Sequence, residues 1–213
     1  MLSASEAAAK RAALEQVMGP AAEDRPAADL TLDDEVDCGS YVRYSASFAT
    51  EPTCRTPAIL CVPRPCLGAS PERRPAALCL MGTDVEVGAM SLVGFSSRPN
   101  RAFASELAER GFVTLSPTYP LFPGYLDSPN SAAGATGLAK LGQTAEETEG
   151  FAALSELGYH SGMRKAIHDN QVAIDCLAAL DYVSMAAGVV CVGHSLGGHV
   201  CPTPSHPTPQ PSS

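Results

Sequence analysis

The sequence has 213 residues, of which 45% are hydrophobic and 17% are charged, so it can build a core and is not disordered throughout. Lys and Arg number 14 against 23 Asp and Glu, and the resulting net charge of −9 argues against a nucleic-acid partner, because such a surface repels phosphate groups. No apolar run approaches the roughly 18 to 20 residues that span a bilayer, which argues against an integral membrane protein.

The first 14 residues predict a short surface helix and not a secretory signal peptide. Glu6 interrupts the charge-free apolar length that a signal peptide needs, and the basic pair Lys10 and Arg11 follows the apolar residues. The Ala- and Ser-rich opening also fits an organelle transit peptide, an alternative that the sequence leaves open. We expect a cytoplasmic protein in which residues 1–35 form an N-terminal helix and linker.

Eight cysteines occur without the spacing of a zinc site or a redox motif. No two are separated in the C-x-x-C pattern, and Cys61 and Cys66 lack a second ligand pair at zinc-site distance. Cys79, Cys176 and Cys191 lie inside apolar runs, where a reduced cysteine packs as a small hydrophobic side chain. We therefore expect buried free thiols in a reducing compartment and no metal site.

The first half of the chain alternates between strand patterns and turns. Residues 41–48 alternate apolar and polar side chains, which is typical of a half-buried antiparallel strand, and residues 58–62 would be its neighbour. Residues 63–75 are rich in Pro and Arg and predict a turn. Residues 76–81 are continuously apolar, as in the buried strands of parallel sheets.

A helix and a strand are predicted next. Asn100 can cap a helix that runs to Arg110, with Gly111 as its C-terminal stop, and residues 112–115 then form a strand. Residues 128–157 are rich in small residues and Glu and have weak periodicity. We expect this segment to be a partly helical, low-complexity excursion over the sheet that carries no chemistry.

Residues 161–180 return to a helical period. Apolar residues form one stripe and charged residues the opposite face, which is typical of a surface helix packed on a sheet. His168 lies among the polar residues, so we expect it on the solvated surface; it and His160 are only fallback candidates for a catalytic base. The stripe consists of Met163, Ile167, Ile174 and Leu177, and the charged face of Arg164, Lys165, Asp169 and Asp175.

Residues 189–192 predict a buried strand that leads directly into a glycine-rich turn. Strand, helix, strand, helix, strand in this order predicts an α/β fold with a mostly parallel sheet and right-handed crossovers. N-terminal antiparallel strands would precede this sheet, and helices would cover both of its faces. We expect residues 36–200 to form this domain.

The turn contains a G-x-S-x-G motif, because residues 193–197 read Gly-His-Ser-Leu-Gly. The motif alone has low specificity, but its place after a buried strand and before a helix matches a nucleophile elbow. In such a turn only small residues fit two positions before and after the serine, and Gly193, Gly197 and Gly198 provide that space. Ser195 is therefore the candidate nucleophile.

An elbow of this kind also supplies part of an oxyanion hole. The backbone N–H of Leu196 would point at the carbonyl oxygen of a substrate. A second N–H would come from the loop after the third predicted strand, where Met81 and Gly82 are the natural candidates. His194 is the variable elbow position, which usually packs, and a metal pair of His194 with His199 is disfavoured because their side chains diverge on a helix.

At these motifs the sequence resembles the α/β-hydrolases of the dienelactone-hydrolase and acetyl-xylan-esterase-like kind. The resemblance runs from about Val36 to His199 and is carried by the order and spacing of several stretches. These are residues 36–44, 74–80, 98–101, 106–115, 119–120 and 158–159, and the elbow. The resemblance implies a Ser, Asp and His triad that hydrolyses ester or related acyl bonds of a small substrate through an acyl-enzyme, without a cofactor.

The sequence departs from the family pattern near the expected site. Met81 stands where relatives typically have a His that organises the oxyanion loop, although backbone donation could survive this change. Thr118 stands where relatives usually have an Asp before Tyr-Pro. Both departures remove a polar group that usually supports the site.

The largest departure concerns the triad itself. In this fold the acid and the histidine follow the serine in sequence, but no Asp or Glu occurs from Tyr182 onward, and only His199 and His206 follow Ser195. We find no residue for the triad acid or the catalytic histidine. The alternative to a serine hydrolase is therefore a catalytically inactive, truncated hydrolase or pseudoenzyme.

Residues 201–213 predict a disordered tail, because the five Pro among them favour extended structure over helix. The family resemblance stops before this tail, so we expect a chain truncated just after the elbow. The strand at residues 189–192 would then lie at an exposed edge of the sheet, through which we expect self-association.

Overall fold

The computed structural model describes residues 3–19, 25–52, 54–84, 86–119 and 159–202. The expected excursion at residues 128–157 and the predicted tail from residue 203 onward lie outside the described residues. Among the described helices, none combines the length and the apolar character that a bilayer span requires.

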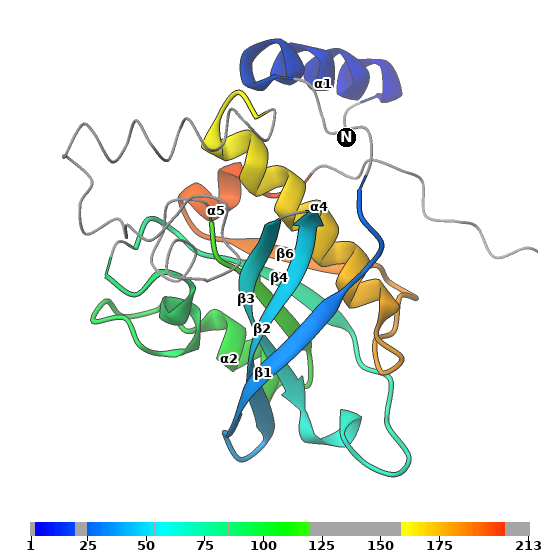
Figure 1. Cartoon of the computed structure of the whole chain (residues 1–213), viewed down its shortest axis with the longest axis vertical. Helices are drawn as coiled ribbons and strands as arrows, with labels where there is room; N and C mark the ends of the chain where they lie inside the picture. The colour runs from blue at the N-terminus through cyan, green and yellow to red at the C-terminus, as the bar shows by residue number, and fades with distance from the viewer. Residues whose placement is uncertain (1–2, 20–24, 53, 85, 120–158, 203–213) are drawn as a thin grey trace, which may run out of the picture.

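Six strands form one sheet in the order β1-β2-β3-β5-β4-β6 (Figure 1). They are β1 (Leu30–Asp37), β2 (Tyr41–Glu51), β3 (Cys54–Pro63), β4 (Ala76–Leu80), β5 (Val113–Pro117) and β6 (Val189–Gly193). The pairs β1–β2, β2–β3 and β3–β5 are antiparallel, whereas β4 pairs in parallel with both β5 and β6. The predicted α/β fold with N-terminal antiparallel strands is confirmed, but the described sheet is mixed and not mostly parallel, because three of its five strand pairs are antiparallel.

The described helices are α1 (Ala4–Met18), α2 (Phe103–Glu109), α4 (Gly162–Ala179) and α5 (Leu196–His199), with short 3₁₀ helices η1 (Arg64–Cys66) and η2 (Gly88–Val93). Two of them, α2 and α4, cover the centre of the sheet. Helix α2 packs on β3, β4 and β5, and α4 packs on β2, β4 and β5. Every residue of β4 and β5 is buried, so both faces of the central strands are covered, as their apolar runs predicted.

Helix α1 is the predicted surface helix and ends at Met18, four residues beyond the predicted segment. Ser3 caps its first turn, because the Ser3 side chain accepts a hydrogen bond from the Glu6 N–H while the Glu6 carboxylate accepts one from the Ser3 N–H. At the other end the chain leaves the helix through Gly19, which has a φ of 87° and lies against the ring of His160.

Strand β1 was not predicted, because residues 30–37 fall where a linker was expected. The strand pairs only with β2 and is exposed along almost its whole length. Its pairing register shifts between Leu32 and Glu35, across two consecutive aspartates. The sequence of β1 is charged and irregular, as in solvated edge strands, and lacks the alternation of apolar and polar residues by which a strand is predicted.

The orientation predicted for α4 was correct for most of the apolar stripe, since Ile167, Ile174 and Leu177 pack on the core, but wrong for Met163 and for the charged face. Met163, expected in the buried stripe, is 37% exposed, whereas Lys165 and Asp169, expected in the solvated face, are buried together with His168. The helix itself was predicted within one residue at each end, and Ser161 caps it by accepting a hydrogen bond from the Arg164 N–H. The charges are buried because β2 and β3 supply partners for them, which a pattern within one segment cannot reveal.

Strand β6 lies at one edge of the sheet. It pairs with β4, and within the described residues no strand pairs with its other side. The prediction of a buried strand here was wrong, because no residue of β6 is buried and Val190 is 46% exposed at the edge of the sheet. The edge therefore presents apolar surface as well as backbone groups that no described strand pairs with. Self-association through this edge stays a prediction, which sedimentation at increasing protein concentration would test.

Two cysteines depart from the expectation of free thiols. Cys191 in β6 and Cys201 after α5 form a disulfide, with Cα atoms 6.6 Å apart, which ties the start of the expected tail to the sheet. The other six cysteines form no disulfide, and most are buried. Burial raises the pKa of Cys61 to about 12 and that of Cys176 to about 11, so these thiols stay neutral and pack as hydrophobic groups.

Candidate functional site

The chain makes a sharp turn between β6 and α5, with Ser195 at its apex. Strand β6 ends at Gly193 and α5 begins at Leu196. Ser195 has φ 52° and ψ −117°, a backbone conformation that residues with a side chain rarely adopt and that surrounding contacts must hold in place. The Ser195 side chain makes no capping hydrogen bond to α5 and lines a pocket instead.

Close backbone contacts hold this turn against the end of β4. A Cβ atom on Gly197 would lie 2.2 Å from the backbone oxygen of Leu80, and one on Gly193 would lie 2.5 Å from the backbone of Gly197. By contrast, a Cβ on Gly198 would meet nothing closer than 3.9 Å. Gly193 and Gly197 are therefore required by the packing of the turn, whereas Gly198 is not.

Three backbone N–H groups at the turn and in the loop after β4 are candidate donors to a bound ligand. Among the described residues, no backbone carbonyl accepts a hydrogen bond from the N–H of Leu196, of Gly82 or of Thr83. The glycine at position 82 also permits a close approach, because a Cβ there would lie 2.7 Å from Nδ1 of His194. The elbow and the loop after β4 thus supply the kind of donors that an oxyanion hole requires.

A small pocket of about 120 Å³ opens at the turn. It is lined by Gly82, Thr83, Asp84, Ser91, Arg98, Arg101, His194 and Ser195. Three residues singled out from the sequence, Gly82, His194 and Ser195, therefore line one pocket. Met81 and Leu196 are not among its lining residues, and the Met81 side chain is buried in the core.

Sequence reasoning missed the role of Asp84 in shaping the pocket. Asp84 is 8% exposed, and its Oδ1 accepts hydrogen bonds of 3.2 Å from the N–H groups of Glu86 and Val87. Its Oδ2 accepts a hydrogen bond from the Ser96 hydroxyl at 3.0 Å. Because both carboxylate oxygens bind the loop between β4 and α2, Asp84 acts as a structural anchor for that loop.

Two arginines bring positive charge to the pocket. Arg98 is exposed and Arg101 is partly buried, and among the described residues neither guanidinium forms an ion pair or a side-chain hydrogen bond. The single carboxylate that lines the pocket belongs to Asp84, whose oxygens are already used. The pocket is thus locally cationic on a chain whose net charge is −9.

None of the described histidines contacts the Ser195 hydroxyl. The ring of His160 packs against Gly19, and Nε2 of His168 lies 3.0 Å from the carbonyl oxygen of Thr50. Nδ1 of His199 lies 2.9 Å from the carbonyl oxygen of Ser195 and not from its side chain, while His194 packs against Gly82. His168 was expected at the solvated surface, and this was wrong, since it is only 3% exposed.

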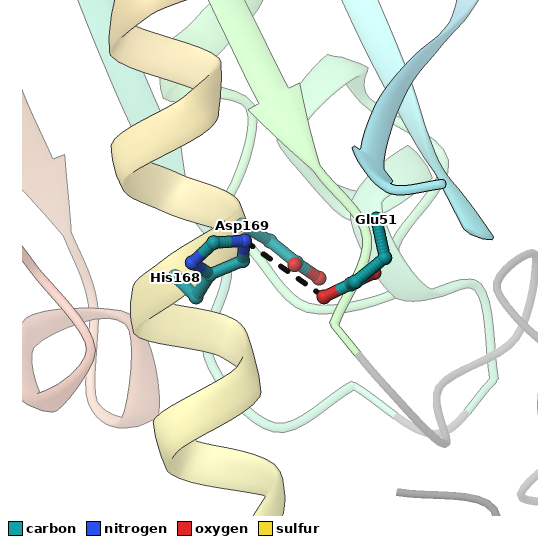
Figure 2. A group of neighbouring side chains, drawn as sticks. All are labelled: Glu51, His168 and Asp169. Atoms are coloured by element: carbon teal, nitrogen blue, oxygen red, sulfur yellow. Dashed lines mark ion pairs between the residues drawn. The ribbon is translucent and has the colours of Figure 1, made fainter. Parts of the chain in front are cut away.

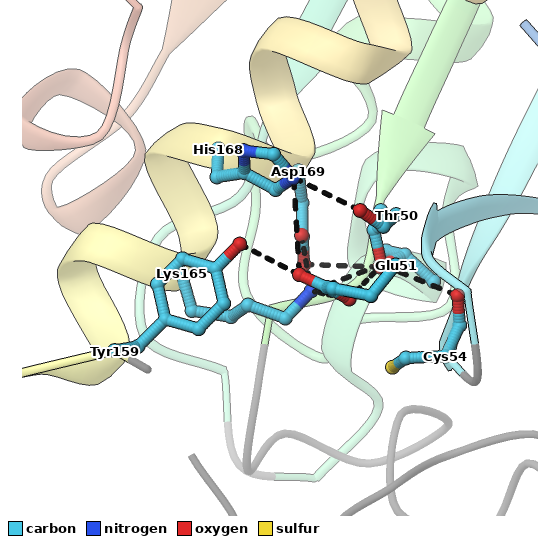
Figure 3. Close-up of polar contacts among 8 residues, drawn as sticks. Thr50, Glu51, Cys54, Tyr159, Lys165, His168 and Asp169 are labelled. Carbon is cyan, nitrogen blue, oxygen red and sulfur yellow. Dashed lines mark hydrogen bonds and ion pairs between the residues drawn. The ribbon is translucent and has the colours of Figure 1, made fainter. Parts of the chain in front are cut away.

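A cluster of buried charged groups joins α4 to the end of β2 (Figures 2 and 3). The Lys165 ammonium lies 3.1 Å from the Glu51 carboxylate, pairs with Asp169 and donates to the Thr50 hydroxyl at 3.0 Å. Further hydrogen bonds run from the Tyr159 hydroxyl to Glu51 at 2.6 Å and from the Thr56 hydroxyl to Asp169 at 2.9 Å. We call these residues, with His168, the buried charge cluster.

Lys165 is the cation of this cluster. Burial alone would lower the pKa of Lys165, but the carboxylates of Asp169 and Glu51 raise it above its ordinary value. Burial alone would raise the pKa of Glu51. The charge of Lys165 and the hydrogen bonds from Tyr159 and Thr50 outweigh this effect and hold the pKa of Glu51 below its usual range. Both groups are therefore charged in the folded chain at neutral pH.

The same cluster contains the atoms of a possible metal-ligand set. One ligand atom each of Glu51, His168 and Asp169 lies within 4.8 Å of the other two. Lys165 is salt-bridged to both carboxylates, so a divalent cation would have to displace a buried ammonium group. We assign the cluster to the stability of the fold and not to metal binding.

Comparison with known protein families gives no match, and comparison with curated proteins gives none. Among solved structures, the chain is similar to a protein assigned as an acetyl xylan esterase from Bacteroides fragilis NCTC 9343, with 16% identity over 91% of this chain and a TM-score of 0.62. It is also similar to acetyl xylan esterase 1 from Thermoanaerobacterium sp. JW/SL YS485, with 13% identity over 83% of this chain and a TM-score of 0.51.

A methylesterase gives a further match, with 13% identity over 82% of this chain and a TM-score of 0.51. The chain spans 47% of the length of each of the two acetyl xylan esterases and 32% of the methylesterase. These identities are low, so the likeness establishes a shared fold: the chain adopts part of the α/β fold of these esterases.

Proposed function

We propose that the chain carries the nucleophile part of a serine hydrolase site, in which Ser195 attacks carboxylic esters or related acyl bonds. The observation that carries the proposal is the conformation of Ser195, at φ 52° between the edge strand β6 and helix α5. The packed glycines on either side support it, because they hold this serine where an elbow requires it. The esterases of similar fold support an ester as the substrate class.

The reaction would proceed by acyl transfer. Ser195 Oγ attacks the carbonyl carbon, and the negative charge that develops on the carbonyl oxygen is stabilised by the N–H of Leu196 and by an N–H of the loop that contains Met81 and Gly82. The carbon–oxygen bond to the alcohol then breaks, the alcohol leaves with a proton, and water hydrolyses the acyl-enzyme. No described residue is assigned as the general base.

The pocket limits the acyl group that fits beside Ser195. Its volume of about 120 Å³ is below the roughly 300–1,000 Å³ of drug-sized sites, which favours a short acyl chain. The free guanidinium groups of Arg98 and Arg101 favour an acyl chain that ends in a negative charge, since they form charge-assisted hydrogen bonds with carboxylates.

Replacing both arginines tests this preference. We expect Arg98→Gln with Arg101→Gln to lower the ratio of kcat/KM for p-nitrophenyl succinate to that for p-nitrophenyl butyrate by about tenfold, a modest factor because Arg98 is exposed. Arg110→Gln removes an exposed charge at the far end of α2 and is the matched control. An unchanged ratio in the double variant would show that the arginines do not meet the substrate.

A second candidate is a catalytically inactive chain with the fold of a hydrolase. The observation that favours it is the missing base, because no described histidine or carboxylate contacts the Ser195 hydroxyl. Loss of a triad member costs about 10⁴ to 10⁶ in turnover, although elbow and oxyanion hole together still accelerate the reaction about 10³- to 10⁴-fold over water.

Ester hydrolysis separates the two candidates. Release of p-nitrophenol from p-nitrophenyl acetate by the purified chain is compared with release by Ser195→Ala. The serine hydrolase predicts a rate that falls to the background of free protein side chains in Ser195→Ala. The inactive chain predicts equal rates for both proteins.

A further inference from the structure

Asn170 connects α4 to the helix that follows Ser195. Its side chain is 0% exposed, and its Nδ2 donates a hydrogen bond of 2.9 Å to the carbonyl oxygen of Val200. Val200 is the C-terminal cap of α5 and is itself buried. Asn170 therefore holds the end of α5 opposite to the end at which Ser195 lies.

Helix α5 needs such support because it is only one turn long. It comprises four residues, and a single turn is not stable by itself in water. The N–H of Val200 donates to the carbonyl oxygen of Leu196, and the N–H of Gly198 donates to that of Ser195. The carbonyl that Asn170 binds thus belongs to the same turn that fixes the backbone of Ser195 and Leu196.

Only one of the two polar groups of the Asn170 amide is hydrogen-bonded within the described part of the chain, which is unfavourable for the stability of the fold. Its Oδ1 is buried and has no hydrogen-bond partner among the residues that the structure describes, and a buried oxygen without a partner destabilises the folded state. Leucine has the same branching and the same number of side-chain heavy atoms and would remove that oxygen, although it would leave the Val200 carbonyl without its donor. Removing the unpaired oxygen would stabilise the fold and removing the donor would destabilise it, so the two effects on the free energy of unfolding oppose each other. We therefore expect the amide to contribute more to the position of α5 than to stability.

We infer that Asn170 is a positioning residue for Ser195, acting through the Val200 carbonyl and the single turn of α5. The inference rests on the proposed function, since it concerns the reactivity of Ser195. It assigns no contact between Asn170 and the substrate. Its consequence is that a variant at position 170 changes the rate of reaction at Ser195 without changing how the reagent binds.

The test compares Asn170→Leu with Val172→Ala, which alters a fully buried core residue of the same helix that is not bonded to α5. With a fluorophosphonate reagent, we expect Asn170→Leu to lower kinact about 10- to 100-fold at unchanged KI and nearly unchanged Tm. Val172→Ala lowers Tm and leaves kinact unchanged. Wild-type kinact in Asn170→Leu, or a loss in Val172→Ala that is as large, would overturn the inference.

If the wild-type chain does not react with the fluorophosphonate, that result counts against the proposed function alone. Hydrogen exchange then still tests the positioning role of Asn170. We expect amides of residues 196–200 to exchange at least tenfold faster in Asn170→Leu than in the wild type, and at the wild-type rate in Val172→Ala. Equal exchange in Asn170→Leu and the wild type would overturn the positioning role.

Discussion

Replacement of Lys165 by Met is expected to lower the free energy of unfolding by about 3 to 5 kcal/mol, as does the removal of one partner from a buried ion pair. Lys165 and Asp169 are almost completely buried, and Glu51 is largely so. Without the ammonium group, two carboxylates remain close together in the interior with no counter-charge. Urea unfolding of the variant and the wild type, followed by circular dichroism, measures the difference.

The control removes the whole group of charges. Glu51→Gln, Lys165→Met and Asp169→Leu together leave no uncompensated charge, and apolar replacement of a buried ion pair is often close to neutral. We therefore expect the triple variant to recover most of the stability that Lys165→Met loses. A loss below about 1 kcal/mol in the single variant would mean that water reaches the cluster and that its charges are not interior.

The same cluster predicts a loss of stability in alkaline solution. The pKa of Lys165 is raised above its ordinary 10.5, chiefly by Asp169 and Glu51 acting against burial, and burial raises that of Tyr159 above 10.0. Both groups bind their protons more tightly in the folded than in the unfolded chain. Their contribution is therefore complete below about pH 10 and declines as the pH rises further, with a shallower decline in Lys165→Met.

Gly197→Ala is expected to lower the rate of fluorophosphonate labelling at Ser195 by at least about 100-fold. The added Cβ would lie 2.2 Å from the backbone oxygen of Leu80, so either the elbow or the end of β4 must move. Both are parts of the site, and a displacement of about 1 Å can cost a factor of that size. Labelling rates are measured by mass spectrometry.

Gly198→Ala provides the matched control, because it makes the same chemical change one residue further along the same helix. Its Cβ would meet only the backbone oxygen of Gly193, at 3.9 Å, and alanine is the better helix former. We expect this variant to react at the wild-type rate. Equal losses in both variants, or none in either, would show that the contact with β4 does not fix the position of the elbow.

Strands β2 to β6 and the sharp turn at Ser195 were predictable because their signals are local. The continuous apolar run of β4 and the glycines around Ser195 reflect burial and close packing at the positions that carry them. Helix α4 and most of its apolar stripe were predictable, but the burial of Lys165 and Asp169 was not. Besides pairing with each other, these two residues bind Glu51 and Thr56, which lie more than 100 residues away in the sequence.

Other parts of the site have no local signal. Asp84 resembles any loop aspartate until its three hydrogen-bond donors are known. Asn170 likewise reads as one polar residue on an amphipathic helix, and only the fold brings it to Val200. The disulfide of Cys191 and Cys201 was missed because their spacing matches no motif and their proximity follows from the sharp turn between them.

The most direct test of the proposed nucleophile is the mass of the folded chain after reaction with a fluorophosphonate, which labels only an activated serine. We predict one adduct per chain, located by peptide mapping at Ser195 and absent in Ser195→Ala. A chain that melts cooperatively but gains no mass, or gains it equally in Ser195→Ala, would contradict the assignment of Ser195 as the nucleophile.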